Sequence, residues 1–164
     1  MSQTLKLLGE LGIVLPKPAA RVANYAPFVM TSSVVEGANP LLWISGQLPL
    51  GPDGAIAERH KGKLDPDSPI EPAREAAERC AINVLAQALA ALGDLDKVVR
   101  VIRLGGFFAV ASSFDALPQA MNGASDLMAR AFGDKGRHAR ATVGVAHLPM
   151  NALCEVEALF ETSF

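Results

Sequence analysis

The chain has 164 residues, of which 50% are apolar and 20% charged, which is enough for one domain with a hydrophobic core. Lys and Arg number 15 against 17 Asp and Glu, so the basic excess that drives nucleic-acid binding is missing. Two cysteines are too few for a disulfide framework, and the sequence has neither a membrane-spanning run nor a signal-peptide pattern. We therefore expect a single cytoplasmic domain over residues 1–164 that binds neither nucleic acid nor membranes.

The first segment, residues 1–19, is predicted to be an N-terminal helical arm. Leu5, Leu8 and Leu11 fall on one stripe of a short helix, and two prolines then extend the chain. In chain order, the further predicted elements are strands at 28–35 and 41–45, a helix at 72–92, a strand at 98–110, a helix at 118–132, and strands at 138–147 and 154–161.

Two glycine-containing pairs interrupt these patterns. Gly105 and Gly106 lie inside a β-rich run and predict a bulge or bend there. Asn122 and Gly123 are poor helix formers inside an otherwise regular helical pattern. Something other than helix propensity is therefore expected to keep this second pair in place.

The interleaved order of strands and helices predicts an α+β fold. We expect a mixed, mostly antiparallel sheet with two helices packed on one face, and the last two strands paired as a hairpin around residues 148–151. The other sheet face is then left uncovered by the chain itself. An uncovered sheet face in a small protein predicts self-association into a closed homo-oligomer.

The sequence contains no pattern that predicts a metal or cofactor. The three histidines, His60, His138 and His147, have no ligand spacing with one another or with the cysteines, and no phosphate-binding or nucleophile motif is present. Cys80 and Cys154 each lie on an apolar stripe, as small core residues do. We expect no metal and no cofactor.

Arg140 is the strongest candidate for a ligand-binding residue, because it interrupts an apolar strand and needs solvent or an anion. It is interpreted either as half of an interfacial salt bridge or as a clamp for a substrate carboxylate. Glu155 and Glu157 are predicted on the same sheet face, as an exposed stripe or as activators of water. A hairpin register places Glu155 opposite Gly144, about 13 Å from Arg140, so a joint site would form between subunits.

Three residues near the first two strands are further candidates. Tyr25, the only tyrosine, is interpreted either as a packing aromatic or as a hydroxyl donor over a pocket. Ser45 and Gly46 end a predicted strand, and the glycine allows a ligand to approach the backbone closely.

Together these segments resemble the YjgF/RidA family of reactive-intermediate deaminases. The residues that carry the resemblance are Asn24-Tyr25, the run Ile-Ser-Gly-Gln-Leu-Pro at 44–49, Ala139-Arg140, His147-Leu148-Pro149 and Glu155-Val156-Glu157. The similarity extends from about residue 20 to the C-terminus. It implies a chorismate-mutase-like fold in one RidA-like domain, a homotrimer with a cleft at each subunit interface, and hydrolysis of 2-imino or 2-enamino acids to 2-keto acids and ammonia.

The resemblance also implies roles for individual residues. Arg140 would bind the substrate carboxylate, Glu155 would orient the attacking water, and Tyr25 would contact the substrate or relay a proton. Ser45 and Gly46 would shape the substrate-binding pocket. Thr142, also assigned to substrate binding, stands where many members of the family have a cysteine.

Other functions remain as alternatives. A non-catalytic trimer that binds a small 2-imino or 2-keto acid would use the same arginine, and the substitution Glu155→Gln would distinguish it from an enzyme. An endoribonuclease, a label that the family often carries, is disfavoured by the net charge of −2. A structural or chaperone-like trimer would not need Arg140 at all.

Overall fold

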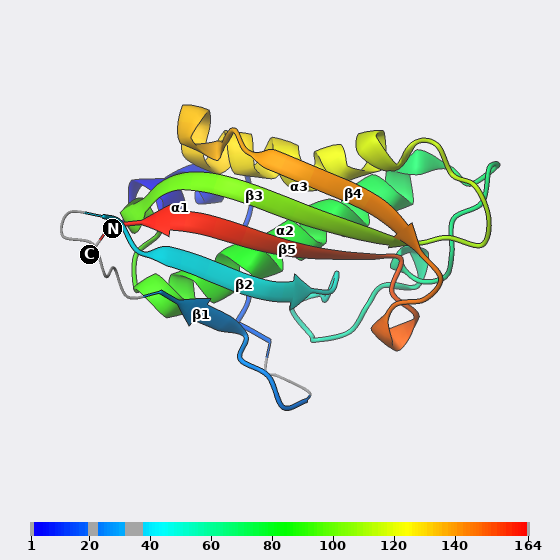
Figure 1. Cartoon of the computed structure of the whole chain (residues 1–164), viewed down its shortest axis with the longest axis horizontal. Coiled ribbons are helices and arrows are strands. Elements are labelled where there is room, and N and C mark those ends of the chain that lie inside the picture. Colours follow the sequence, from blue (N-terminus) through cyan, green and yellow to red (C-terminus); the bar gives the residue numbers. More distant parts are fainter. Residues whose placement is uncertain (1, 20–22, 32–37, 164) are drawn as a thin grey trace.

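The protein is described here by a computed structural model covering residues 2–19, 23–31 and 38–163. Figure 1 shows a sheet with helices behind it. In chain order the elements are α1 (Gln3–Glu10), β1 (Phe28–Met30), β2 (Leu41–Gln47), η1 (Glu58–His60), α2 (Ile70–Leu92), η2 (Leu95–Lys97), β3 (Val98–Ala109), α3 (Leu117–Phe132), η3 (Gly133–Gly136), β4 (Ala139–Val145), η4 (Pro149–Asn151) and β5 (Cys154–Thr162), where η marks a 3-10 turn.

The described strands form a five-stranded sheet in the order β1-β2-β5-β3-β4. β3 and β4 are parallel, whereas the other neighbouring pairs are antiparallel. The expected α+β fold is confirmed: the sheet is mixed and mostly antiparallel, and α2 and α3 lie on one of its faces (Figure 1). The predicted strand at 28–35 is a strand over Phe28–Met30, and its part at 32–35 lies outside the described residues.

The predicted hairpin between the last two strands is wrong, because β3 lies between β4 and β5 (Figure 1). β4 instead runs parallel to β3, with Leu104 paired to Arg140 and Phe107 paired to Val143. Parallel strands need a crossover connection, and α3 supplies it as the helix of a β3–α3–β4 unit. β4 is therefore an edge strand of the sheet.

The predicted bulge at Gly105 and Gly106 is also wrong. Both glycines pair in regular register with β4 and β5, and the register shifts of β3 lie nearer its start. Each glycine instead makes room for a side chain. A Cβ atom on Gly106 would lie 2.4 Å from Met121 Sδ, and one on Gly105 would lie 2.6 Å from Glu157 Oε1.

The main core lies between the sheet and the helices. Alternate residues of each strand point toward α2 and α3, and the alanines of α2 allow a close approach. The largest fully buried side chains are those of Phe108, Phe160, Leu8, Leu42, Leu85, Leu95, Leu104, Met121, Leu127, Met128, Val84 and Val98. Leu8 joins α1 of the predicted arm to this core.

The opposite face of the sheet is left uncovered by the described elements, as expected, and it carries exposed apolar side chains. Val29 is 55% exposed, Trp43 is 51% exposed and Val143 is 46% exposed. No helix in the described ranges is long and apolar enough to cross a membrane. No described helix covers this face of the sheet (Figure 1).

Candidate functional site

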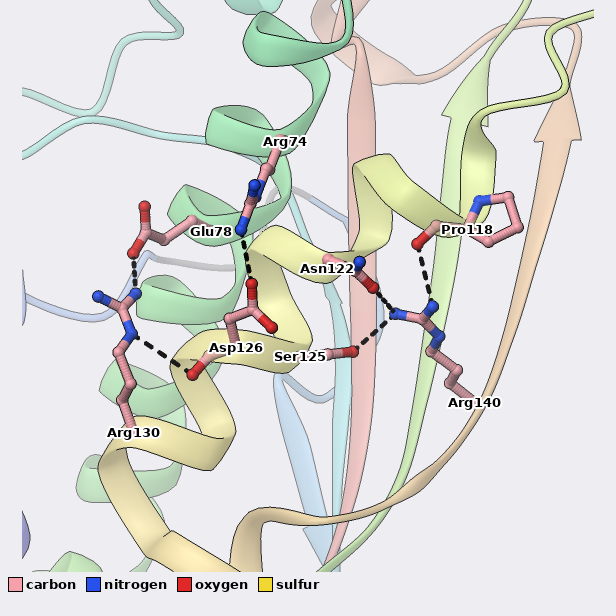
Figure 2. Close-up of polar contacts among 8 residues, drawn as sticks. All are labelled: Arg74, Glu78, Pro118, Asn122, Ser125, Asp126, Arg130 and Arg140. Atoms are coloured by element: carbon pink, nitrogen blue, oxygen red, sulfur yellow. Dashed lines mark hydrogen bonds and ion pairs between the residues drawn. The ribbon is translucent and has the colours of Figure 1, made fainter.

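Arg140 lies on β4 and points toward α3 rather than across the open sheet face (Figure 2). Its Nη1 donates to Asn122 Oδ1 and to Ser125 Oγ, both at 2.9 Å, and its Nη2 donates to the Pro118 carbonyl oxygen at 3.0 Å. All three acceptors belong to α3. The helix therefore holds the guanidinium group in one place.

The positive charge of Arg140 is not compensated by these contacts, because an amide, a hydroxyl and a carbonyl are neutral acceptors. None of the ion pairs found in the described residues includes Arg140. A guanidinium group has five N–H donors, so Nε and one hydrogen of Nη2 remain for another acceptor. A carboxylate fits such a charged, planar donor pair.

The Asn-Gly pair departs from the helical sequence pattern because its two residues contact two different elements, β4 and α2. Asn122 faces β4 and binds Arg140, whereas Gly123 faces α2. A Cβ atom on Gly123 would lie 1.9 Å from the Arg74 carbonyl oxygen, so only glycine allows the two helices to cross this closely. Asp126 forms an ion pair with Arg74 at 2.7 Å, and Arg130 forms one with Glu78. These two pairs hold α3 against α2 (Figure 2).

Glu155 lies on β5 and points to the open face of the sheet. A Cβ atom on Gly46 would lie 1.8 Å from Glu155 Oε1, so the glycine of β2 is what makes room for this carboxylate. Burial raises the pKa of Glu155, and the nearby charge of Glu157 raises it further. Glu157 itself is paired with Arg103 at 2.9 Å. The carboxylate of Glu155 has no hydrogen-bond or ion-pair partner within the described ranges, so it can act as a base.

Ser45 connects β2 to the segment that carries Tyr25. Its Oγ donates to the Ala26 carbonyl oxygen at 2.7 Å, and its backbone N–H donates to the Pro27 carbonyl oxygen at 3.0 Å. Tyr25 is 40% exposed next to this connection. The candidates Tyr25, Ser45, Gly46 and Glu155 thus lie around the neighbouring strands β2 and β5.

Thr142 follows Arg140 by two residues and shares its face of β4. Its Oγ1 atom is shielded from solvent and has no hydrogen-bond partner among the described residues. A shielded hydroxyl without a partner costs about 1–3 kcal/mol of stability. Thr142 is therefore a residue whose hydroxyl the fold itself does not need.

The prediction that Arg140 and Glu155 share a sheet face is wrong. Leu104 pairs with both Arg140 and Ala158, which places Arg140 on the helix side, whereas Glu155 follows the other alternation. The two Cα atoms are separated by two strand spacings across the sheet and three residues along it, which amounts to about 14 Å. One small substrate cannot contact both side chains within one chain.

The residues that hold Arg140 were not identified as functional from the sequence. Asn122 carried a signal nonetheless, since it belongs to the Asn-Gly pair that helix propensity could not explain, whereas Ser125 carried none. Among the described residues, no group of three or more His, Cys, Asp or Glu side chains is arranged to hold a metal ion. Cys80 and Cys154 are buried, as core cysteines are.

Comparison with known proteins agrees with this architecture. The family model described as "YjgF/chorismate mutase-like, putative endoribonuclease" matches residues 6–162. Protein TCP17 of Trypanosoma cruzi is 42% identical over 155 residues, which cover 94% of this chain and 91% of that protein.

Solved structures with the same fold include two from bacteria. The protein Atu1372 of Agrobacterium tumefaciens, described as of unknown function, has a TM-score of 0.84 at 44% identity, covering 98% of this chain and 92% of that one. RidA from the Antarctic bacterium Psychrobacter sp. PAMC 21119 has a TM-score of 0.59 at 22% identity, covering 88% and 94%. The sheet order, the helix layer and these similarities define a protein of the chorismate-mutase-like fold class. Within that class, the chain belongs to the YjgF/RidA family.

Proposed function

We propose that this protein hydrolyses 2-imino and 2-enamino acids to 2-keto acids and ammonia, in clefts between the subunits of a homotrimer. The observation that supports the proposal is the environment of the Arg140 guanidinium group. Its guanidinium group is held by three neutral acceptors of α3, and its charge has no carboxylate partner among the described residues. Such a group favours a ligand that brings its own carboxylate.

An enamine first takes up a proton from solvent at its β-carbon and becomes the iminium ion. The later chemistry asks little of the protein, because the iminium carbon is already electrophilic. Arg140 binds the carboxylate and fixes the substrate. Glu155, whose pKa is raised by burial, accepts a proton from water as the water oxygen adds to the iminium carbon. It returns that proton to the amino group of the carbinolamine. Ammonia then leaves, the hydroxyl proton is lost, and the 2-keto acid forms with its new oxygen derived from water.

The separation of the candidate residues supports a site built from two chains. Arg140 lies on the edge strand β4, and Glu155 lies on the open face, about 14 Å away in the same chain. A neighbouring copy that packs against the open apolar face brings its own edge strand close to Glu155. Tyr25, Ser45 and Gly46 then complete the cleft on the Glu155 side.

A non-catalytic protein that binds a small carboxylic acid is the second candidate. The observation that favours it is the same isolated charge of Arg140, which serves binding as well as catalysis. An endoribonuclease is less well supported, because the chain carries a net charge of −2.

A coupled assay tests the proposal. 2-Aminoacrylate is generated by a dehydratase, and its decay is followed with the wild type, Arg140→Ala, Glu155→Gln and the control Arg137→Ala, whose side chain is 82% exposed. We expect the wild type and the control to accelerate the decay and the two site variants to lose most of the effect. Glu155→Gln should still bind pyruvate. If the wild type does not accelerate the decay but still binds pyruvate, the protein is the non-catalytic binding protein and not an enzyme.

A further inference from the structure

A chain of hydrogen bonds leads from Arg140 to the turn that precedes β4. Arg140 Nη1 lies 2.9 Å from Ser125 Oγ, and Ser125 Oγ lies 3.0 Å from His138 Nε2. His138 Nδ1 in turn lies 2.6 Å from the Gly136 carbonyl oxygen. Figure 2 shows the first of these contacts. The proposed reaction gives His138 no role, although it lies half-buried beside the site.

The Gly136 carbonyl oxygen, at the end of this series of hydrogen bonds, determines which atom donates in each of them. A carbonyl oxygen only accepts, so His138 Nδ1 carries a proton, and Nε2 of the neutral ring is an acceptor. The Ser125 hydroxyl therefore donates to His138, and its oxygen lone pairs accept from Arg140. All the donors point the same way, and bonds aligned like this polarise and strengthen one another.

The far end of the chain is rigid. A Cβ atom on Gly136 would lie 2.1 Å from the Met128 carbonyl oxygen, so this turn packs backbone to backbone on α3. The carbonyl that fixes the His138 tautomer is therefore held against the same helix that carries Ser125. His138 thus connects the Gly136 turn to Ser125, and both of these pack on or belong to α3.

We propose that His138 is a positioning residue for Arg140. By accepting the Ser125 hydroxyl proton, it keeps the serine oxygen turned toward the guanidinium group, so that Nε and the second Nη2 hydrogen stay aimed at the ligand. The identity of the ligand that Arg140 binds rests on the proposed function, whereas the positioning of Arg140 by His138 does not.

Protonation of His138 reverses the bond to Ser125. Nε2 then donates, so Ser125 Oγ faces two donors and its own proton loses its acceptor. The pKa of His138 lies below its usual range, chiefly because burial disfavours the charged ring; the Gly136 carbonyl opposes this shift and the charge of Arg140 adds to it. The acidic groups on neighbouring elements are already paired, Asp126 with Arg74 and Asp134 with Arg137. Ligand affinity should therefore fall when the pH drops below the usual histidine range.

Pyruvate binding, measured by calorimetry between pH 5 and pH 8, tests the proposal together with steady-state kinetics. Ser125→Ala and His138→Leu should weaken pyruvate binding about tenfold at pH 7 and raise KM, while kcat changes less than about twofold. His138→Gln keeps a neutral acceptor near the Nε2 position. It should bind like the wild type at pH 7 and lose less affinity at pH 5.

Asp126→Asn is the matched control. It adjoins Ser125 on α3 but faces Arg74 of α2, so the substitution removes one exposed ion pair next to the serine without displacing α3 or touching Arg140 (Figure 2). It should keep wild-type affinity at every pH. Wild-type affinity and pH dependence in His138→Leu would overturn the proposal while leaving the role of Arg140 intact.

A second readout separates this proposal from the proposed function. If the wild type neither deaminates imines nor binds pyruvate, the proposed function fails, and nitrogen-15 NMR of the side chains still tests the positioning. We expect the Nδ1-protonated tautomer of His138 and a change in the Arg140 guanidinium signals as His138 titrates. Guanidinium signals that stay constant through that titration would refute the proposal.

Discussion

Arg140 and Glu155 lie on opposite faces of the same sheet, on strands that β3 separates. Arg140 is held by α3 on the helix side, while Glu155 lies in the space that Gly46 leaves on the open side. Within one chain, these two side chains cannot act on one small molecule. A catalytic role for both therefore requires a second copy, and this requirement can be tested directly.

Mixing two inactive variants should restore activity. Arg140→Ala keeps Glu155, and Glu155→Gln keeps Arg140, so a hetero-oligomer of the two contains some interfaces with both intact side chains. With random assembly of a closed ring, about one site in four is complete, and activity should return to about a quarter of the wild type. The measurement is imine decay after co-expression. A mixture no more active than either variant would place the whole site within one chain.

The pH dependence should respond to Glu157. Burial and the Glu157 charge both raise the pKa of Glu155, and the base must be ionised to act, so kcat/KM should rise with pH through that pKa. Glu157→Gln removes the charge and frees Arg103, and both changes lower the pKa of Glu155. The acid limb of the profile should therefore move to lower pH.

Glu161→Gln is the control for this shift, because Glu161 lies at the far end of β5 and accepts a hydrogen bond from Asn39 at 2.7 Å. An acid limb that moves equally in both variants, or not at all in Glu157→Gln, would mean that Glu155 is not the group that titrates.

Glu155→Gln should also raise the free energy of unfolding. The raised pKa means that the ionised carboxylate destabilises the fold, and this cost appears as the pH rises above its ordinary value.

Thr142→Val should stabilise the protein. The hydroxyl is shielded from solvent and has no partner among the described residues, so replacing it with a methyl group should raise the free energy of unfolding by about 1 kcal/mol. Urea denaturation measures the change. If the hydroxyl binds the substrate, as the family resemblance implies, pyruvate affinity should fall in the same variant. An unchanged or lower stability would show that the hydroxyl has a partner in the assembled protein.

The elements themselves could be predicted from the sequence because their signals are local. The apolar stripe of α2 and the alternation of β5 each depend on neighbours within a few residues, and both were placed within two residues of their bounds. The order of strands in the sheet depends on contacts that are distant in sequence. The short connection between β4 and β5 favoured a hairpin, and nothing local indicated that β3 would lie between them.

The same limit explains the error in the site. Arg140 was identified because an arginine inside an apolar strand needs a partner, which is a local argument. Its face was wrong because the face follows from the pairing of β4 with β3. The contacts to Asn122 and Ser125 join residues 15 or more positions apart, and only the unexplained Asn-Gly pair pointed to the first of them.

Gly123→Ala should destabilise the protein and weaken ligand binding together. Alanine is the better helix former by about 1 kcal/mol, but its Cβ atom would lie 1.9 Å from the Arg74 carbonyl oxygen and force α2 and α3 apart. We expect a net loss of about 2 kcal/mol in the free energy of unfolding. Pyruvate affinity should also fall, since Asn122 and Ser125 move with the helix.

Gly9→Ala is the matched control, because Gly9 lies inside α1 and a Cβ atom there would meet nothing within 4 Å. This variant should gain up to about 1 kcal/mol from helix propensity and leave pyruvate binding unchanged. If both glycine variants were stabilised alike, the close crossing of α2 and α3 would not be what requires a glycine at position 123.

Asp96→Ala should release the N-terminal helix from the core. Asp96 accepts from the backbone N–H groups of Gln3 at 2.7 Å and Thr4 at 2.9 Å, and from Thr4 Oγ1 at 2.7 Å. These hydrogen bonds, first among them that of the Thr4 hydroxyl, lower the pKa of Asp96 well below its usual range. Because the folded-state pKa is depressed, the contribution to stability is present at neutral pH and is lost as the pH falls below about 4.

Hydrogen exchange of the α1 amides at pH 7 measures this release. Exchange should be faster in Asp96→Ala than in Asp96→Asn, which keeps one acceptor oxygen, and unchanged in Asp134→Asn, whose carboxylate is 96% exposed. Leu8 should become accessible in the same variant, because its burial depends on the position of α1. Unaltered exchange in Asp96→Ala would mean that the packing of Leu8, rather than the carboxylate, holds the arm on the core.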